Sequence, residues 1–376
     1  MSVSVHDHAR PLPHRVFNFS AGPAALPEDV VREAREDLWS IFGTGIGVLE
    51  HSHRGPVIDR VLGDAIQDCR RLAGVGETHE VLFLPAGATL QFAMIPMNFL
   101  PADGVADYLD TGVWAHKSIE EAKRLGSVNV AFDGRPSHYD HLPSDAELAL
   151  SPSAAYLSYC SNNTVFATQF EAPPRTNAPL VCDASSDMFS RPLDFDRHAF
   201  VYASAQKNLG PAGITLVIVR KDFLEAARPA MKERLPSMLD YRAHATAGSR
   251  LNTPPTFGMY LIGRVLHWIL AQGGVPEMLR RAQARSTLLY EAIDTSGGFY
   301  RGLAKKESRS LMNVSFRTPS TDLDDRFVTE AAEAGLDGLR GHRDAGGLRA
   351  SIYNACPVAG AAELALFMRE FARQNG

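Results

Sequence analysis

Two residues of opposite charge stand at the ends of apolar, strand-like stretches, and together they suggest cofactor chemistry. Lys207 lies in the run AFVYASAQKNLGPAGITLVIVR, on a turn rich in Gly and Pro. A lysine amine that is partly withdrawn from water has a lowered pKa and can form a Schiff base. Asp183 ends the apolar stretch LVC and could hold a protonated ring nitrogen. Taken singly, Lys207 also fits a solvated turn lysine and Asp183 a turn or helix cap.

Three further features fit the same cofactor. The loop Ala86-Gly87-Ala88-Thr89 enters a helix-like segment, and free amides at a helix start favour an anion such as a phosphate. This loop matches neither GxGxxG nor GxxxxGK, so it is not a recognisable nucleotide loop. Trp114 could stack on a planar ring or pack in the core, and the Thr164 hydroxyl could reach a ring substituent or bond local backbone. The complete set meets the needs of pyridoxal 5′-phosphate.

The elements that must position these residues alternate between strand-like and helix-like segments, which predicts an α/β fold around a mostly parallel sheet. Strands are expected at 81–85, 107–110, 128–132, 154–160, 179–185, 200–205 and 214–220. Helices are expected at 89–100, 115–126, 258–272, 275–294, 327–335 and 361–374, with further strands at 310–317 and 347–354. Ligands of such sheets bind beyond the carboxyl ends of the strands.

The chain length favours two domains, since single cores stop growing near roughly 250 to 300 residues. We predict a large domain over residues 28–281 and a small domain formed by residues 1–27 and 282–376. Residues 1–14 are expected to be a disordered tail and, having no apolar core, not a secretory signal.

Composition excludes several classes of function. The net charge of −5 has no basic block, so neither nucleic acid nor an anionic membrane is an expected partner. No apolar run is long enough to span a membrane. The four cysteines lie far apart without a CxxC pair, which indicates neither a zinc site nor a disulfide framework and favours the cytosol.

Several segments resemble the phosphoserine aminotransferase family, a group of fold-type I, class V aminotransferases. They are FNFSAGPAALP, HSHRG, QFAMIPMN, SAQKNLGPAG, NTPPTF and GHRDAGGLRASIYNA, and the resemblance runs from Phe17 to the C-terminus. It implies a large domain with a mostly parallel sheet flanked by helices, followed by a smaller α/β domain. It also implies a cytoplasmic, pyridoxal phosphate-dependent enzyme of serine biosynthesis. The expected reaction is reversible ping-pong transfer of the amino group of L-glutamate to 3-phosphohydroxypyruvate, giving O-phospho-L-serine and 2-oxoglutarate.

The resemblance also assigns roles to individual residues. It implies that Lys207 binds the cofactor covalently, Asp183 pairs with its ring nitrogen and Trp114 stacks on its ring. The other cofactor contacts that it implies are Thr164 to the ring hydroxyl and Ala88, Thr89 and Gln206 to the phosphate. Asn252 and Thr253 would reach the phosphate of a neighbouring subunit, which implies a homodimer with shared active sites. The substrate contacts that it implies are Arg349 to the α-carboxylate and His53, Arg54, His342 and Arg343 to the substrate phosphate.

Two departures and three alternatives accompany this interpretation. Some family members carry an arginine where Thr89 stands and a serine where Ala21 stands, so one cation and one hydrogen bond to substrate are missing here. The nearest alternative is another class V enzyme, such as a serine or alanine:glyoxylate aminotransferase. A cysteine desulfurase would need a mobile cysteine, and Cys356 fits packing better. A non-catalytic protein that binds the cofactor is the third alternative, and nothing in the sequence favours it.

Overall fold

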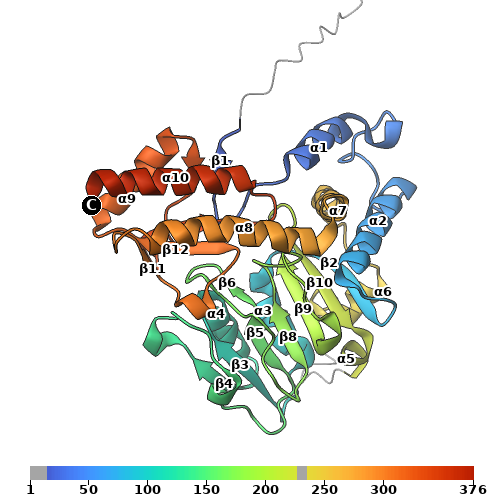
Figure 1. Cartoon of the computed structure of the whole chain (residues 1–376). Helices are drawn as coiled ribbons and strands as arrows, with labels where there is room; N and C mark the ends of the chain where they lie inside the picture. Colours follow the sequence, from blue (N-terminus) through green and yellow to red (C-terminus); the bar gives the residue numbers. More distant parts are fainter. Residues whose placement is uncertain (1–14, 227–234) are drawn as a thin grey trace, which may run out of the picture.

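A seven-stranded sheet forms the centre of the molecule (Figure 1). The structure is a computed structural model that describes residues 15–226 and 235–376, so the predicted disordered tail lies outside the described residues. The strands follow the order β2-β10-β9-β8-β5-β3-β4, and β10 runs antiparallel to both neighbours while the other pairs are parallel. Their bounds are β2 His79–Pro85, β3 Val105–Asp110, β4 Ser127–Asp133, β5 Leu157–Cys160, β8 Leu180–Asp183, β9 His198–Ser204 and β10 Ile214–Arg220. The predicted mostly parallel α/β sheet is confirmed.

The central strands are apolar along their whole length because both faces of the sheet are covered. In β10, Leu216 and Ile218 point into one core while Val217 and Val219 point into the other. The first core packs against α1 (Glu28–Ser40), α2 (Pro56–Ala73) and α7 (Thr256–Ala271). The second packs against α3 (Ala88–Phe99), α4 (Val113–Lys123), α5 (Lys221–Ala226) and α6 (Tyr241–Thr246). A sheet enclosed in this way provides a rigid, water-free base for the loops at its edge.

Helices α1 and α2 were not among the segments predicted from the sequence pattern. The local signals for α2 are nevertheless present, since Pro56 occupies its first turn and Gly74 ends it with φ 68°. Its buried residues Ile58, Val61, Leu62 and Ala65 follow the i, i+3, i+4, i+7 spacing of an amphipathic helix, so the apolar periodicity was a signal that the sequence analysis missed.

A separate core lies above the sheet in Figure 1, where α8 (Gly274–Asp294), α9 (Thr321–Glu333) and α10 (Val358–Asn375) gather. Its buried residues are Phe19 together with residues between Leu289 and Phe371. Strands β11 (Arg301–Gly302), β12 (Asn313–Arg317) and β14 (Leu348–Ser351) form its small sheet, and β1 (Phe17–Asn18) pairs with β13 (Leu336–Asp337). Residues 17–19 thus belong to this C-terminal core. The domain boundaries at 27/28 and 281/282 stay predictions.

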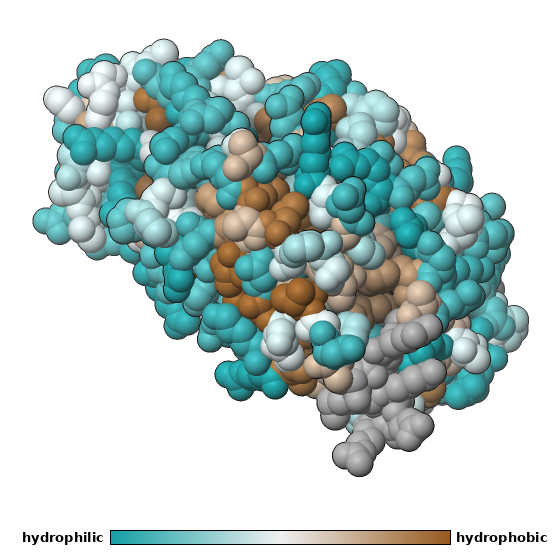
Figure 2. Space-filling model, turned by 90° about the horizontal axis from the view of Figure 1, so that it is seen from below, coloured by the Kyte–Doolittle hydropathy of each residue, from teal (hydrophilic) through white to brown (hydrophobic). Residues whose placement is uncertain are grey.

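The outer surface combines hydrophilic and apolar areas. Figure 2 shows an apolar band crossing a largely hydrophilic face of the molecule. Among residues 15–226 and 235–376, no helix has both the length and the apolarity that a membrane crossing requires.

Asn208 links three segments that are distant in sequence. Its side-chain amide donates to the carbonyl of Ser186 at 2.9 Å, in the turn after β8. Its side-chain oxygen accepts from the backbone amide of Asn354 at 2.9 Å, in the loop after β14. Asn208 is buried, so water cannot replace either bond. A polar contact beside the β9–β10 turn therefore joins the loops of the large sheet to the C-terminal core.

We predict that Asn208→Ala destabilises the protein by about 2 kcal/mol or more, since each buried group left without a partner costs about 1–3 kcal/mol. The thermal unfolding midpoint should fall by about 2–3 °C or more. The exposed Asn177 serves as a matched control, and Asn177→Ala should leave the midpoint nearly unchanged. Equal midpoints for the two variants would contradict the role assigned to Asn208.

Candidate active site

Lys207 lies on the turn between β9 and β10, with its amine directed to a buried hydroxyl. Its Nζ donates to Oγ1 of Thr164 at 2.6 Å, and Thr164 follows β6 (Asn162–Asn163). Desolvation lowers the pKa of Lys207, while the negative charge of Asp183 opposes this shift. A lysine in such surroundings holds its proton less firmly than one in water, which suits nucleophilic and proton-transfer chemistry.

Asp183 forms the carboxyl end of β8, the strand that neighbours β9. Its Oδ1 accepts from the backbone amide of Ser185 at 2.9 Å. Desolvation raises the pKa of Asp183, and the charge of Lys207 and the hydrogen bond from Ser185 lower it. A buried carboxylate with one facing cation can hold a further positive charge, such as a protonated ring nitrogen.

The turn before α3 offers uncapped amides. Gly87 precedes the helix, and no side chain caps the first turn, so the first amides of α3 have no intrahelical partners. Ala86, in this turn, has φ 75°. Two hydrogen bonds of 2.9 Å fix it: the Ala86 amide donates to the Gly213 carbonyl, and the Thr215 hydroxyl donates to the Ala86 carbonyl. The amides therefore face the pocket in a fixed orientation that suits an anion.

These segments enclose one pocket. It is lined by Gly87, Ala88, Thr89, Phe92, Trp114, Asp183, Ser185, Ser204, Gln206 and Lys207. The structure thus brings together the predicted residues Lys207, Asp183, Trp114, Ala88, Thr89 and Gln206, with Thr164 joined through the amine.

Trp114 stands in the first turn of α4, where its indole borders the Lys207 amine. The Lys207 Nζ lies 5.9 Å from the centroid of the indole ring. The indole Nε1 is buried without a hydrogen-bond partner among the described residues. An unpaired buried donor is costly, so the indole is placed here at the expense of stability. Its ring forms one wall of the pocket.

Basic residues of the small domain approach this pocket from the other side. One guanidinium nitrogen of Arg349, on β14, lies 3.5 Å from the Thr164 carbonyl, and desolvation lowers the pKa of Arg349. The His342 ring lies 6.5 Å from the Trp114 indole, centroid to centroid, in an edge-to-face arrangement. Arg343 is exposed and its Nε lies 3.5 Å from a carboxylate oxygen of Asp344.

Eight predicted residues are not among those that line the pocket of their own chain: His53, Arg54, Thr164, Asn252, Thr253, His342, Arg343 and Arg349. Arg54 and Thr253 are exposed, and His53 is partly exposed. Asn252 carries a buried side-chain oxygen without a partner among the described residues. Their assigned contacts with substrate and cofactor stay predictions.

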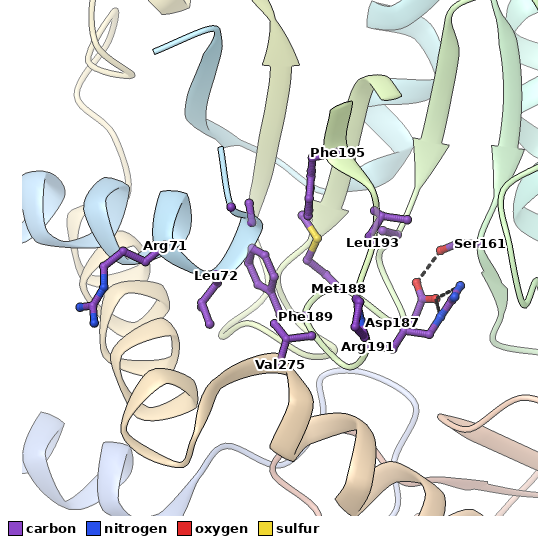
Figure 3. Close-up of a pocket in the computed structure, with 14 residues that line it drawn as sticks. Arg71, Leu72, Ser161, Asp187, Met188, Phe189, Arg191, Leu193, Phe195 and Val275 are labelled. Carbon is purple, nitrogen blue, oxygen red and sulfur yellow. Dashed lines mark hydrogen bonds and ion pairs between the residues drawn. The ribbon is translucent and has the colours of Figure 1, made fainter. Parts of the chain in front are cut away.

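A larger cavity of about 240 Å³ lies behind the turn that follows Asp183, whereas the pocket at Lys207 measures about 110 Å³ (Figure 3). In Figure 3, the side chains of Ser161 and Arg191 point to Asp187. Asp187 accepts from the Ser161 hydroxyl and from Arg191 NH2 at 3.2 Å. The Ser161 amide donates to the Asp183 carbonyl at 3.0 Å. The ion pair between Asp187 and Arg191 neutralises the polar wall of this cavity. Through Ser161, the same wall supports the backbone of Asp183.

The sequence analysis missed three pocket residues: Phe92, which packs in the core beside the pocket, and the serines Ser185 and Ser204. Ser185 lies two residues after Asp183, and its hydroxyl accepts from the Ser204 amide at 3.0 Å. The Ser204 hydroxyl donates to the Gln206 side-chain oxygen at 2.5 Å. Both serines stand at strand ends beside the two charged residues, which is the signal that could have identified them.

The residues present fit pyridoxal 5′-phosphate. The uncapped start of α3 suits its phosphate, the unpaired indole suits its ring, and Asp183 and Lys207 suit its ring nitrogen and aldehyde. Cys356 does not fit a mobile nucleophile, because it is buried and desolvation raises its pKa to about 11.

Comparisons with known proteins agree with this geometry. Residues 16–364 match the model of the aminotransferase class-V family. The phosphoserine aminotransferase of Herpetosiphon aurantiacus is 46% identical over 362 residues, which cover 96% of this chain and 99% of that protein. The solved phosphoserine aminotransferase of Bacillus circulans subsp. alkalophilus is 44% identical, with a TM-score of 0.93 over 96% of this chain and 99% of that one.

A pyridoxal phosphate-bound phosphoserine aminotransferase from Trichomonas vaginalis is 36% identical, with a TM-score of 0.89 over 94% of this chain and 100% of that one. Fold, pocket and full-length similarity lead to one assignment. The chain belongs to the phosphoserine aminotransferase family of the class V aminotransferases.

Proposed function

We propose that this enzyme transfers the amino group of L-glutamate to 3-phosphohydroxypyruvate, using pyridoxal 5′-phosphate held at Lys207, in serine biosynthesis in the cytoplasm. The observation that carries the proposal is the joint placement of Lys207, Asp183 and Trp114 around one pocket. The relative from Trichomonas vaginalis, described as bound to pyridoxal phosphate, supports the choice of cofactor. When bound, this cofactor supplies an aldehyde that condenses with amines and a ring that accepts an electron pair from the substrate.

Each residue of the pocket would have its own role in the reaction. Lys207 Nζ would take the proton from the substrate Cα, which its lowered pKa favours, and deliver it to the cofactor carbon that carried the aldehyde. Asp183 keeps the ring nitrogen protonated, and Thr164 holds the ring hydroxyl after Lys207 moves. Trp114 stacks on the ring, while Ala88, Thr89 and Gln206 bind the cofactor phosphate.

Arg349 is suited to the α-carboxylate that both substrates carry. Its guanidinium is drawn out of water, lies at the Thr164 carbonyl, and forms no ion pair within the part of the chain that the structure describes. A planar guanidinium binds a carboxylate through two parallel hydrogen bonds. His53, Arg54, His342 and Arg343 are proposed to face the substrate phosphate.

We also propose a homodimer with shared active sites, in which Asn252 and Thr253 reach the partner's cofactor phosphate. Two observations support it. The side-chain oxygen of Asn252 is buried without a partner among residues 15–226 and 235–376. Trp39 is 86% exposed at the end of α1, and Leu49 is 59% exposed nearby in sequence, which is unusual for a surface that stays in water.

Lys207→Ala should abolish covalent attachment of the cofactor and reduce turnover by at least about 10²- to 10⁴-fold, the usual contribution of proton transfer. Mass spectrometry after borohydride reduction measures attachment, and coupled assays measure turnover. Lys123→Met, which removes an exposed lysine paired with Glu120, is the control and should behave as wild type. Normal turnover by Lys207→Ala would refute the proposal.

Asp183→Asn should lower kcat about 10- to 100-fold, because losing a hydrogen bond to a charged group costs about 1.5–3 kcal/mol. Asp183→Glu keeps the negative charge and should retain more activity. Absorbance of the bound cofactor, titrated against pH, reports whether the ring environment has changed. Equal activities for the Asn and Glu variants would show that the charge at position 183 has no role.

A shared site can be tested by mixing two inactive chains, one with Lys207→Ala and one with Arg54→Ala. In a two-fold symmetric dimer, each mixed dimer would regain one native site, so random mixing should restore about a quarter of wild-type activity. No recovery above the sum of the two variants would place Arg54 and Lys207 in sites of the same chain.

Glyoxylate, assayed as the acceptor in place of phosphohydroxypyruvate, distinguishes the glyoxylate aminotransferase alternative.

A further inference from the structure

Lys117 is a basic residue near the pocket that the family resemblance did not single out. It lies in α4, three residues after Trp114, so the two side chains share one face of the helix. Its Nζ is 4.7 Å from the centroid of the Trp114 indole ring. Lys117 is exposed, and within the described chain its amine has neither an ion pair nor a hydrogen bond. Its charge is therefore available to a ligand.

The indole of Trp114 is the common neighbour of three basic side chains from three different elements. Lys117 comes from α4, His342 from the loop before β14, and Lys207 from the β9–β10 turn. The distances to the ring centroid are 4.7 Å for the Lys117 amine, 5.9 Å for the Lys207 amine and 6.5 Å for the His342 ring centroid. The edge of the cofactor pocket is thus positively charged.

The acidic groups nearby do not neutralise Lys117. Glu120 and Glu121, three and four residues further along α4, pair instead with Lys123 at 3.1 Å and Arg124 at 3.7 Å. Asp344 lies 3.5 Å from His342 Nδ1 and 3.5 Å from Arg343 Nε, so its charge is shared by those two residues. Asp110, at the end of β3, lies 2.7 Å from the His116 ring.

The pKa of His342 is affected by the same positive charges. Desolvation lowers its pKa, Asp344 opposes this, and Arg349, Arg343 and Lys117 lower the pKa further. An anion placed among these residues would relieve their mutual repulsion.

We propose that Lys117 binds the distal phosphate of the acceptor substrate and thereby contributes to the preference for phosphorylated over unphosphorylated oxo acids. The inference rests on the proposed function, because it concerns the same pocket and substrate class. A lysine amine is a mobile point charge on a flexible chain, which suits a phosphate that arrives and leaves in each cycle. Thr89, which also lines the pocket, carries no charge, so the basic groups near Trp114 bear more of this binding.

The test compares Lys117→Met, Lys117→Arg and the control Lys123→Met. Lys117→Met should lower kcat/KM for 3-phosphohydroxypyruvate about 10-fold or more and weaken inhibition by inorganic phosphate to a similar degree. The half-reaction with glutamate, which has no phosphate, should change less than about twofold. Lys117→Arg should restore most of the loss, whereas Arg349→Gln should impair both half-reactions.

Two results would overturn the inference. If Lys117→Met matches Lys123→Met in every measurement, Lys117 does not contact the phosphate. If both half-reactions fall equally, Lys117 acts on the Trp114 indole and the cofactor and not on the acceptor. Failure of the proposed function itself is distinguishable, because the unmodified enzyme would then fail to use 3-phosphohydroxypyruvate.

Discussion

The site depends on keeping one amine and one carboxylate partly out of water at the ends of adjacent strands. Desolvation disfavours the charged form of each, so it lowers the pKa of Lys207 and raises that of Asp183, while their mutual attraction opposes both shifts. This balance persists only if water stays out and the strands cannot slide. The sheet meets both needs, because β8 and β9 are buried along their full length.

The position of Arg349 relative to Lys207 is set by polar contacts between the two domains. Asn162 donates to the Asn313 side chain at 2.8 Å and accepts from the Ser310 hydroxyl at 2.5 Å, and all three residues are buried. Unlike apolar packing, such bonds tolerate little displacement, since a half-satisfied buried network costs more than none. The network therefore fixes β12, and with it the neighbouring β14 that carries Arg349, against the loop after β5.

The residues predictable from sequence were those with a charge or ring at a strand end. Lys207, Asp183 and Trp114 each follow an apolar run, and the sheet brings such positions to one edge. Ser185 and Ser204 also stand at strand ends, but they carry neither a charge nor a ring, and small hydroxyl residues are common in turns. Lys117 lies in a helix that the sequence predicts, but an exposed helix lysine is common, and only the 4.7 Å approach of its amine to the Trp114 ring centroid singles it out. The contacts predicted for Asn252 and Thr253 would involve a second chain, which no pattern within one sequence can position.

Charge distribution explains why local cations must carry substrate binding. The chain has a net charge of −5, so at long range it repels an anionic substrate. At 0.1 M ionic strength this repulsion is screened beyond about 10 Å, whereas basic groups inside a partly dry pocket are screened much less. Arg349, His342 and Lys117 lie around the pocket at this shorter range. The proposed binding of doubly anionic substrates therefore needs only a few basic groups near the pocket, and an overall basic protein is not needed.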